Sequence, residues 1–189
     1  MQWRNHSNSY GIISIGLHWL LAIALLAMFF VGTWMVDLSY YSEWYHRAPE
    51  LHKAAGVVIL LLMVVRLIWR WSNPRPAPLG KVKWQNRSAE LLHQLFYLLV
   101  ILIAVSGYLI STAEGKGIDV FGLFTLPALN WQFELQADRA GIVHKYLAWA
   151  FMLLVGLHLG AALKHHFINR DNTLKRMLKP LKGDIHADS

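Results

Sequence analysis

Residues 141–166 read GIVHKYLAWAFMLLVGLHLGAALKHH, an apolar run long enough to form a membrane-spanning helix. Four residues of this run are spaced seven apart and form a stripe: His144, Phe151, His158 and His165. Seven residues turn a helix through about 700°, so these four side chains lie close together on one helix face. His144 and His158 are expected about 21 Å apart along the axis. That distance leaves room for two separate metal or haem sites at different depths.

The composition is that of a membrane protein. Of the 189 residues, 56% are hydrophobic and 15% are charged, whereas about 25% of the residues in soluble domains are charged. Apolar runs predict spanning helices over residues 11–36, 53–71, 89–111 and 141–166. We therefore expect an all-α integral membrane protein, a four-helix transmembrane bundle that forms a single domain over residues 1–189.

Basic residues concentrate on one side of the predicted membrane. All but five of the 18 Lys and Arg residues lie on the side that holds both termini. The five exceptions are Arg47, Lys53, Lys116, Arg139 and Lys145. The positive-inside rule therefore predicts that both termini are cytoplasmic. The net charge of +7 reflects this topology, and a nucleic acid partner is not expected.

The absence of cysteine limits the possible redox chemistry. It excludes disulfides, thiolate ligation of haem, cysteine-held iron–sulfur clusters and covalent attachment of a c-type haem. A haem bound by this chain would have to be non-covalent and held by histidine or methionine.

Depth sorts the histidines into two levels. His52 and His144 each begin the outer end of a predicted helix, while His18 and His158 lie about 9 to 10 Å from the inner surface. Two histidines on opposite faces suit the axial positions of a low-spin haem. Zinc, the main rival metal, prefers four compact ligands. Depth alone does not distinguish His18 from His93 as the inner partner of His158.

Two glycines share stripes with inner histidines. Gly32 follows His18 by fourteen residues, and Gly107 follows His93 by the same interval. Both glycines are expected at the outer level, where they would either leave space beside a planar group or allow neighbouring helices to pack closely.

Three cations are further site candidates. Lys53 and Lys145 directly follow the outer histidines, where they would pair with haem propionates or attract a small anion. Arg66, within the second span, either snorkels towards the cytoplasm or faces an anionic group inside the bundle.

Two segments outside the spans carry shorter predictions. Residues 111–140 are long for a simple connection, and we expect a lid on the external surface, with or without a short helix. In the tail, residues 171–173 read DNT and are expected to cap a short helix that runs through Leu178.

Several motifs together resemble the bacterial cytochrome b561 family. They are His18-Trp19, Glu50-Leu51-His52-Lys53, Gly156-Leu157-His158, Lys164-His165-His166-Phe167 and the tail from Asp171 to Met177. The likeness covers nearly the whole chain and implies a multi-pass protein of the bacterial inner membrane. The family is typified by a superoxide oxidase that reduces ubiquinone.

The resemblance also implies ligands and partners. It implies two b-type haems, one held by His18 and His158 and the other by His52 and His144, and so it favours His18 over His93. The position that matches His165 lines a ubiquinone site in this family. A histidine there can hydrogen-bond a quinone carbonyl and pass on a proton.

The expected function is therefore transmembrane electron transfer from a periplasmic donor to ubiquinone. The donor would be either superoxide itself, which would make the chain an oxidoreductase, or a partner protein. The chain could alternatively be the haem-bearing membrane anchor of a larger oxidoreductase. A haem-free metal or proton transporter is the remaining alternative, although few charged residues lie within the spans.

Overall fold

The computed structural model describes residues 2–80, 82–129 and 131–180. Four long helices dominate it: α1 (Ile12–Val36), α2 (Trp44–Trp71), α3 (Lys83–Ser111) and α4 (Gln136–Phe167). Two short strands, β1 (Ile118–Val120) and β2 (Phe124–Leu126), precede α4, and a short helix, α5 (Lys175–Leu178), follows it.

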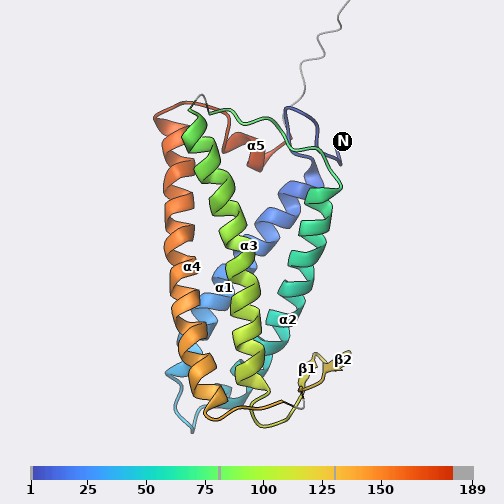
Figure 1. The fold of residues 1–189 in the computed structure, drawn as a ribbon, viewed down its shortest axis with the longest axis vertical. Helices are drawn as coiled ribbons and strands as arrows, with labels where there is room; N and C mark the ends of the chain where they lie inside the picture. The colour runs from blue at the N-terminus through green and yellow to red at the C-terminus, as the bar shows by residue number, and fades with distance from the viewer. Residues whose placement is uncertain (1, 81, 130, 181–189) are drawn as a thin grey trace, which may run out of the picture.

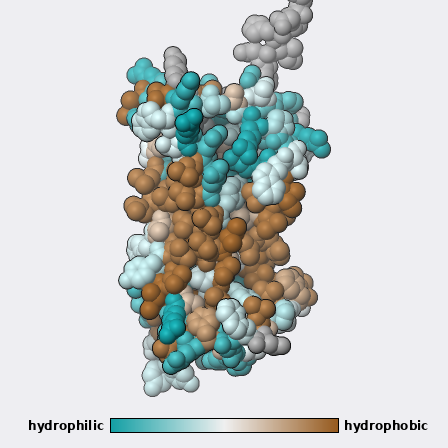
Figure 2. Space-filling view, in the orientation of Figure 1, coloured by the Kyte–Doolittle hydropathy of each residue, from teal (hydrophilic) through white to brown (hydrophobic). Residues whose placement is uncertain are grey.

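The long helices form a bundle with an apolar middle. Each of the four is long and apolar enough to cross a membrane. Figure 2 shows a hydrophobic band across the middle of the visible face of the bundle, with hydrophilic residues gathered towards both ends. This architecture confirms the expected four-helix transmembrane fold.

The helices pack most closely in two pairs. Helix α1 runs beside α2, α3 runs beside α4, and α2 also contacts α3 (Figure 1). Between them lies a core to which every long helix contributes. Its buried members are Leu21, Ile59, Met63, Val100 and Phe151.

Three helices begin earlier than their apolar runs predict. Helix α2 starts at Trp44 instead of residue 53, and α3 starts at Lys83 instead of residue 89. Helix α4 starts at Gln136, whose buried side chain donates to the carbonyl oxygen of Leu109 at 2.9 Å and so attaches α4 to the end of α3. The hydropathy pattern indicates only the part of a helix that lies in lipid, and these helices continue into the polar layer.

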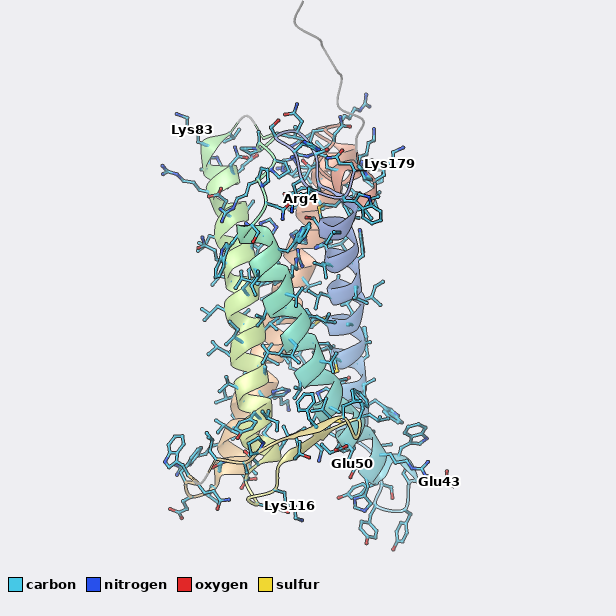
Figure 3. The ribbon with its side chains drawn as sticks, turned by 90° about the vertical axis from the view of Figure 1, so that its right-hand side faces the viewer. Arg4, Glu43, Glu50, Lys83, Lys116 and Lys179 are labelled. Atoms are coloured by element: carbon cyan, nitrogen blue, oxygen red, sulfur yellow. The ribbon has the colours of Figure 1, made fainter. Side chains whose placement is uncertain are left out.

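A β-hairpin occupies part of the segment expected to form a lid. Strands β1 and β2 pair antiparallel, with Ile118 opposite Leu126. The turn residues Phe121 and Gly122 both have positive φ angles, 54° and 70°. Ile118 and Val120 are buried, and β1 contacts α2. The hairpin therefore covers the end of α2 that also carries Glu50 (Figure 3).

The opposite end of the bundle holds both ends of the described chain (Figure 1). We call it the inner end, and the hairpin end the outer end. The guanidinium group of Arg176, in α5, donates to the carbonyl oxygen of Ala77 at 2.9 Å and lies over the ring of Tyr10. The indole of Trp19 donates to the carbonyl oxygen of Met177 at 2.6 Å. These contacts join the N-terminal segment, the loop after α2 and α5 into one layer.

Basic residues Arg4, Lys83 and Lys179 lie at the inner end, and Glu43 and Glu50 lie at the outer end (Figure 3). The positive-inside rule predicts that such a basic end faces the cytoplasm.

Candidate functional site

One uninterrupted helix carries the entire histidine stripe. His144, Phe151, His158 and His165 all lie in α4. His144 and His158 are fourteen residues apart, which corresponds to about 21 Å along a regular helix. Helix α4 therefore presents histidines at an outer level, an inner level and its inner end.

At the outer level, His144 of α4 faces His52 of α2. Their ring centroids are 6.4 Å apart, with an angle of 72° between the rings. Depth along the helices had predicted this pair from the sequence. The two histidines come from different helices, so the pair links the α1–α2 and α3–α4 halves of the bundle.

Hydrogen bonds orient the ring of His144. Its Nδ1 lies 2.9 Å from the carbonyl oxygen of Ile103 and 3.1 Å from the hydroxyl of Ser106. The hydroxyl of Ser106 donates to the same carbonyl at 2.9 Å. With its proton on Nδ1, His144 donates to Ile103 and keeps the lone pair of Nε2 for a metal.

Each outer histidine packs against a glycine. A Cβ atom at Gly32 would lie 3.1 Å from Cε1 of His52, and one at Gly107 would lie 3.2 Å from Cε1 of His144. Both distances are shorter than ordinary van der Waals contact. The two glycines, which the sequence placed at the outer level, thus leave space for the imidazole rings.

At the inner level, His158 has two histidine neighbours. The ring of His18, in α1, lies 6.4 Å from that of His158. The ring of His93, in α3, lies 5.6 Å from it. The structure thus brings together both alternatives that depth left open.

Arg66 points into the bundle. Its Nη2 lies 3.1 Å from Nδ1 of His18, and its guanidinium lies over the ring of Tyr97 at 5.9 Å. The sequence left two alternatives for Arg66, snorkelling towards the cytoplasm or facing an anionic group inside the bundle. The side chain has the interior orientation, and its neighbours there are His18 and Tyr97. Because a guanidinium only donates hydrogen bonds, Nδ1 of His18 is the acceptor in this contact.

Apolar side chains fill the space between the two levels. Phe151 is 7% exposed and packs with Phe96 at a centroid distance of 5.4 Å. Phe151 also belongs to the core shared by all four long helices. This layer separates the two histidine levels with apolar side chains.

The two lysines next to the outer histidines differ in exposure. Lys53 is half-buried and Lys145 is exposed. Among the residues that the structure describes, neither takes part in a salt bridge.

At the inner end of α4, His165 meets a carboxylate. Its Nδ1 lies 2.6 Å from Oδ2 of Asp171, and the amide of Asn169 lies 3.1 Å from the same nitrogen. The backbone N–H of Thr173 donates to the other carboxylate oxygen at 2.9 Å. Partial burial acts to raise the pKa of Asp171, but hydrogen bonds from Thr173 and His165 outweigh it and hold this pKa below its ordinary value.

The sequence had predicted Asp171 only as part of a helix cap. The turn after α4 brings it back onto His165, with Arg170 in the left-handed region at φ 54°. Ser106 and Tyr97 were also not anticipated. Neither residue belongs to a histidine stripe, so periodicity gave no signal for them.

Comparison with known proteins finds relatives of one family that match nearly the whole chain. The family model described as prokaryotic cytochrome b561 matches residues 9–180. Cytochrome b561 homolog 2 of Escherichia coli K12 is 48% identical over 185 residues, which are 97% of this chain and 98% of that protein.

The chain belongs to the prokaryotic cytochrome b561 family. A protein of Yersinia pestis named "Probable superoxide oxidase CybB" is 31% identical over 92% of this chain and 98% of its own length. Cytochrome b561 homolog 1 of E. coli K12 is 32% identical over 90% of this chain and 97% of its own length.

Membership of the cytochrome b561 family implies a b-type haem, and the histidine pairs fit one. An iron atom bonded to two imidazoles holds their centroids about 6 Å apart, because metal–imidazole bonds are about 2 Å long. The outer pair and the His18–His158 pair both show 6.4 Å. In addition, the buried Nδ1 of His52 has no hydrogen-bond partner among the described residues.

The side chains available as metal ligands also suit haem better than zinc. In the described part of this cytochrome, no group of three or more His, Asp or Glu side chains is placed to hold one metal ion. The residues available to a cofactor are imidazoles in cross-helix pairs, and paired histidines are usual axial ligands of a low-spin haem.

Proposed function

We propose that this cytochrome binds two b-type haems and passes electrons from a donor at its outer end to ubiquinone at its inner end. The observation that carries the proposal is the pair of cross-helix histidine contacts at two levels of α4, each with centroids 6.4 Å apart. When bound, each haem would supply a one-electron iron couple, and two haems at different depths would give electrons a path through the bilayer.

At the outer level, His52 and His144 would be the axial ligands. The Ile103 carbonyl and Ser106 hold the ring of His144 in position through Nδ1. Gly32 and Gly107 have no side chain, so the two rings keep the space that a Cβ at either position would take. Lys53 and Lys145, one residue beyond the ligands, are the cations available for the propionates of this haem.

At the inner level, we assign His18 and His158 as the ligands. Their centroid separation equals that of the outer pair, whereas His93 lies closer to His158, at 5.6 Å. Ligation through Nε2 would place the proton of His18 on Nδ1, which then could no longer accept from Arg66. The guanidinium would be released to pair with a propionate, and His93 would remain a neighbour of the site.

The donor is the less defined partner. Superoxide is one candidate, because a relative with 31% identity is named as a probable superoxide oxidase. Each superoxide anion would lose one electron and leave as oxygen. Lys145 is exposed at the outer level, but acidic residues such as Glu43 and Glu50 share that end (Figure 3). A protein donor docking near the hairpin is the second candidate.

At the inner end, His165 is proposed to contact ubiquinone. Reduction to ubiquinol takes two electrons and two protons, and the protons would come from the cytoplasmic side. The carboxylate of Asp171 holds Nδ1 of His165 at 2.6 Å. When both ring nitrogens carry a proton, Nδ1–H would donate to this carboxylate, and Nε2–H would donate to a quinone carbonyl and deliver its proton.

The direct test is a haem count on protein purified in mild detergent. A pyridine haemochrome assay should give two b-type haems per chain, and dithionite should reduce both. One haem per chain would leave only one pair as ligands and interrupt the path. A colourless protein would contradict the proposal and favour a haem-free transporter.

If superoxide is the donor, generated superoxide should reduce the purified protein at a rate approaching the diffusion limit.

The variant Asp171→Asn tests the quinone end. The variant removes the negative charge beside His165 and leaves only an uncharged amide oxygen to accept from Nδ1, so the doubly protonated ring loses its charged partner and reduction of a soluble ubiquinone analogue should slow by about tenfold. Haem content and the rate of haem reduction from the outer side should not change. Stopped-flow spectra of haem reoxidation by quinone measure the effect.

The matched control for this variant is Asp37→Asn, an exposed carboxylate just after α1 at the outer end. It should reoxidise at the unmodified rate. An equal rate for Asp171→Asn would remove His165 and Asp171 from the proposed quinone site while leaving the haem assignments intact.

A further inference from the structure

A lateral cavity of about 270 Å³ lies between α2 and α3 near the inner end. No histidine lines it, so it is separate from both haem-level pairs. Its polar and aromatic lining consists of Arg70, Trp71, Arg75, Glu90, Gln94 and Tyr97. The lining comes from the last turns of α2, the segment after it and the first half of α3, which lie side by side in Figure 3.

The cavity wall has an excess of positive charge. Arg70 and Arg75 are its cations, and Glu90 is its single acid. Within residues 2–80, 82–129 and 131–180, the salt bridges involve none of these three side chains. Two guanidinium groups without a carboxylate partner match a phosphate group, which accepts their paired N–H donors.

The uncharged lining supplies further hydrogen-bonding groups. The hydroxyl of Tyr97 is buried and has no hydrogen-bond partner among the described residues. The side-chain amide of Gln94 lies on the same wall. A ligand with several oxygen atoms would satisfy both groups. A neutral quinone ring would add no negative charge to this wall, which has two cations and one acid.

The surroundings are those of a membrane interface. Trp71 is 69% exposed, and tryptophans in this position commonly lie at the level of the lipid headgroups. Leu67, one turn deeper in α2, is the apolar part of the wall. Ile68 and Leu91 are exposed on the neighbouring helix surfaces. A ligand here would thus have a phosphate at the interface and apolar chains directed into the bilayer.

We propose that this cavity binds the headgroup of an acidic phospholipid, with Arg70 and Arg75 on the phosphate and Tyr97 and Gln94 on other headgroup oxygens. Basic pockets between helices on the cytoplasmic side are suited to such lipids. The ring of Tyr97 also lies beneath Arg66, which contacts His18. The bound lipid therefore borders the inner histidine cluster.

Native mass spectrometry of the haem-loaded full chain tests the site. The protein would be exchanged into micelles that contain phosphatidylglycerol or phosphatidylcholine with identical acyl chains. One phosphatidylglycerol should stay bound, and the retained amount of phosphatidylcholine should be lower by about tenfold or more. The variant Arg70→Gln/Arg75→Gln should lose the bound lipid by a similar factor. Its absorption spectrum checks that the bundle remains folded.

The matched control is Lys83→Gln/Lys179→Gln, which removes two exposed cations from the same end (Figure 3). It should retain phosphatidylglycerol as the unmodified chain does. Equal retention of the two lipids by the unmodified protein would overturn the proposal even if the arginine variant did not fold. So would a bound quinone mass that is lost when Arg70 and Arg75 are replaced, since the quinone would then occupy this cavity. Displacement of the lipid by millimolar inorganic phosphate would indicate a site for the free anion and would also overturn the proposal.

Discussion

Replacing His144 with alanine should halve the haem content, from two haems per chain to one, and stop electron entry from the outer side. The ring of His144 faces His52 at 6.4 Å, so its loss would leave the outer haem with only one of its two proposed histidine ligands. The inner histidines lie about 21 Å away along α4 and should keep their haem. A pyridine haemochrome count and the rate of reduction by an impermeant outer donor in vesicles measure the two effects.

A second variant reaches the same site without removing a ligand. A Cβ at Gly107 would already lie 3.2 Å from the ring of His144, so Gly107→Val should displace the ring and also lower the haem content. Gly160→Val is its control, because a Cβ at Gly160 meets nothing within 4 Å.

His46→Ala is the control for the loss of an imidazole, since His46 is exposed at the start of α2. It should leave both haems in place. Two haems per chain in folded His144→Ala would show that His144 is not an axial ligand.

His18→Ala should remove the inner haem, whereas His93→Ala should retain both haems. Both side chains lie against His158, but only His18 does so at the 6.4 Å separation of the outer pair. The haem count should therefore fall from two to one in His18→Ala, and the outer haem should remain reducible from outside without passing its electron to quinone. Electron paramagnetic resonance of the oxidised protein would identify which low-spin signal is lost.

The reverse result would reassign the inner ligand to His93. Loss of the inner haem in both variants would indicate that His93 supports the site through a contact that the haem requires. In that case His93→Gln, which retains a polar side chain, should restore the haem, while His18→Gln should not. Each of these outcomes is distinguishable with the same spectra.

The bundle could largely be predicted from the sequence because membrane insertion depends on the length and polarity of local segments. The apolar runs predicted all four long helices, but they missed how far α2 and α3 continue into the polar layer. They also missed the hairpin, since three-residue strands are too short for a periodic pattern to appear. Val120 is fully buried there through contacts of the hairpin that are distant in the sequence.

The sequence by itself determined which face of α4 carries the histidines and at which depths, because the helical period sets both. It also determined that no thiolate could take part, since the chain contains no cysteine. Depth also predicted that His52 would lie opposite His144, which is where the structure places it. Only the tertiary structure decided that His18 and His93 both reach His158 and that Asp171 returns to His165. The physical reason is that the helical repeat fixes only the face of its own helix on which a side chain lies. The rotation of each helix and the identity of its neighbours follow from packing of the whole bundle.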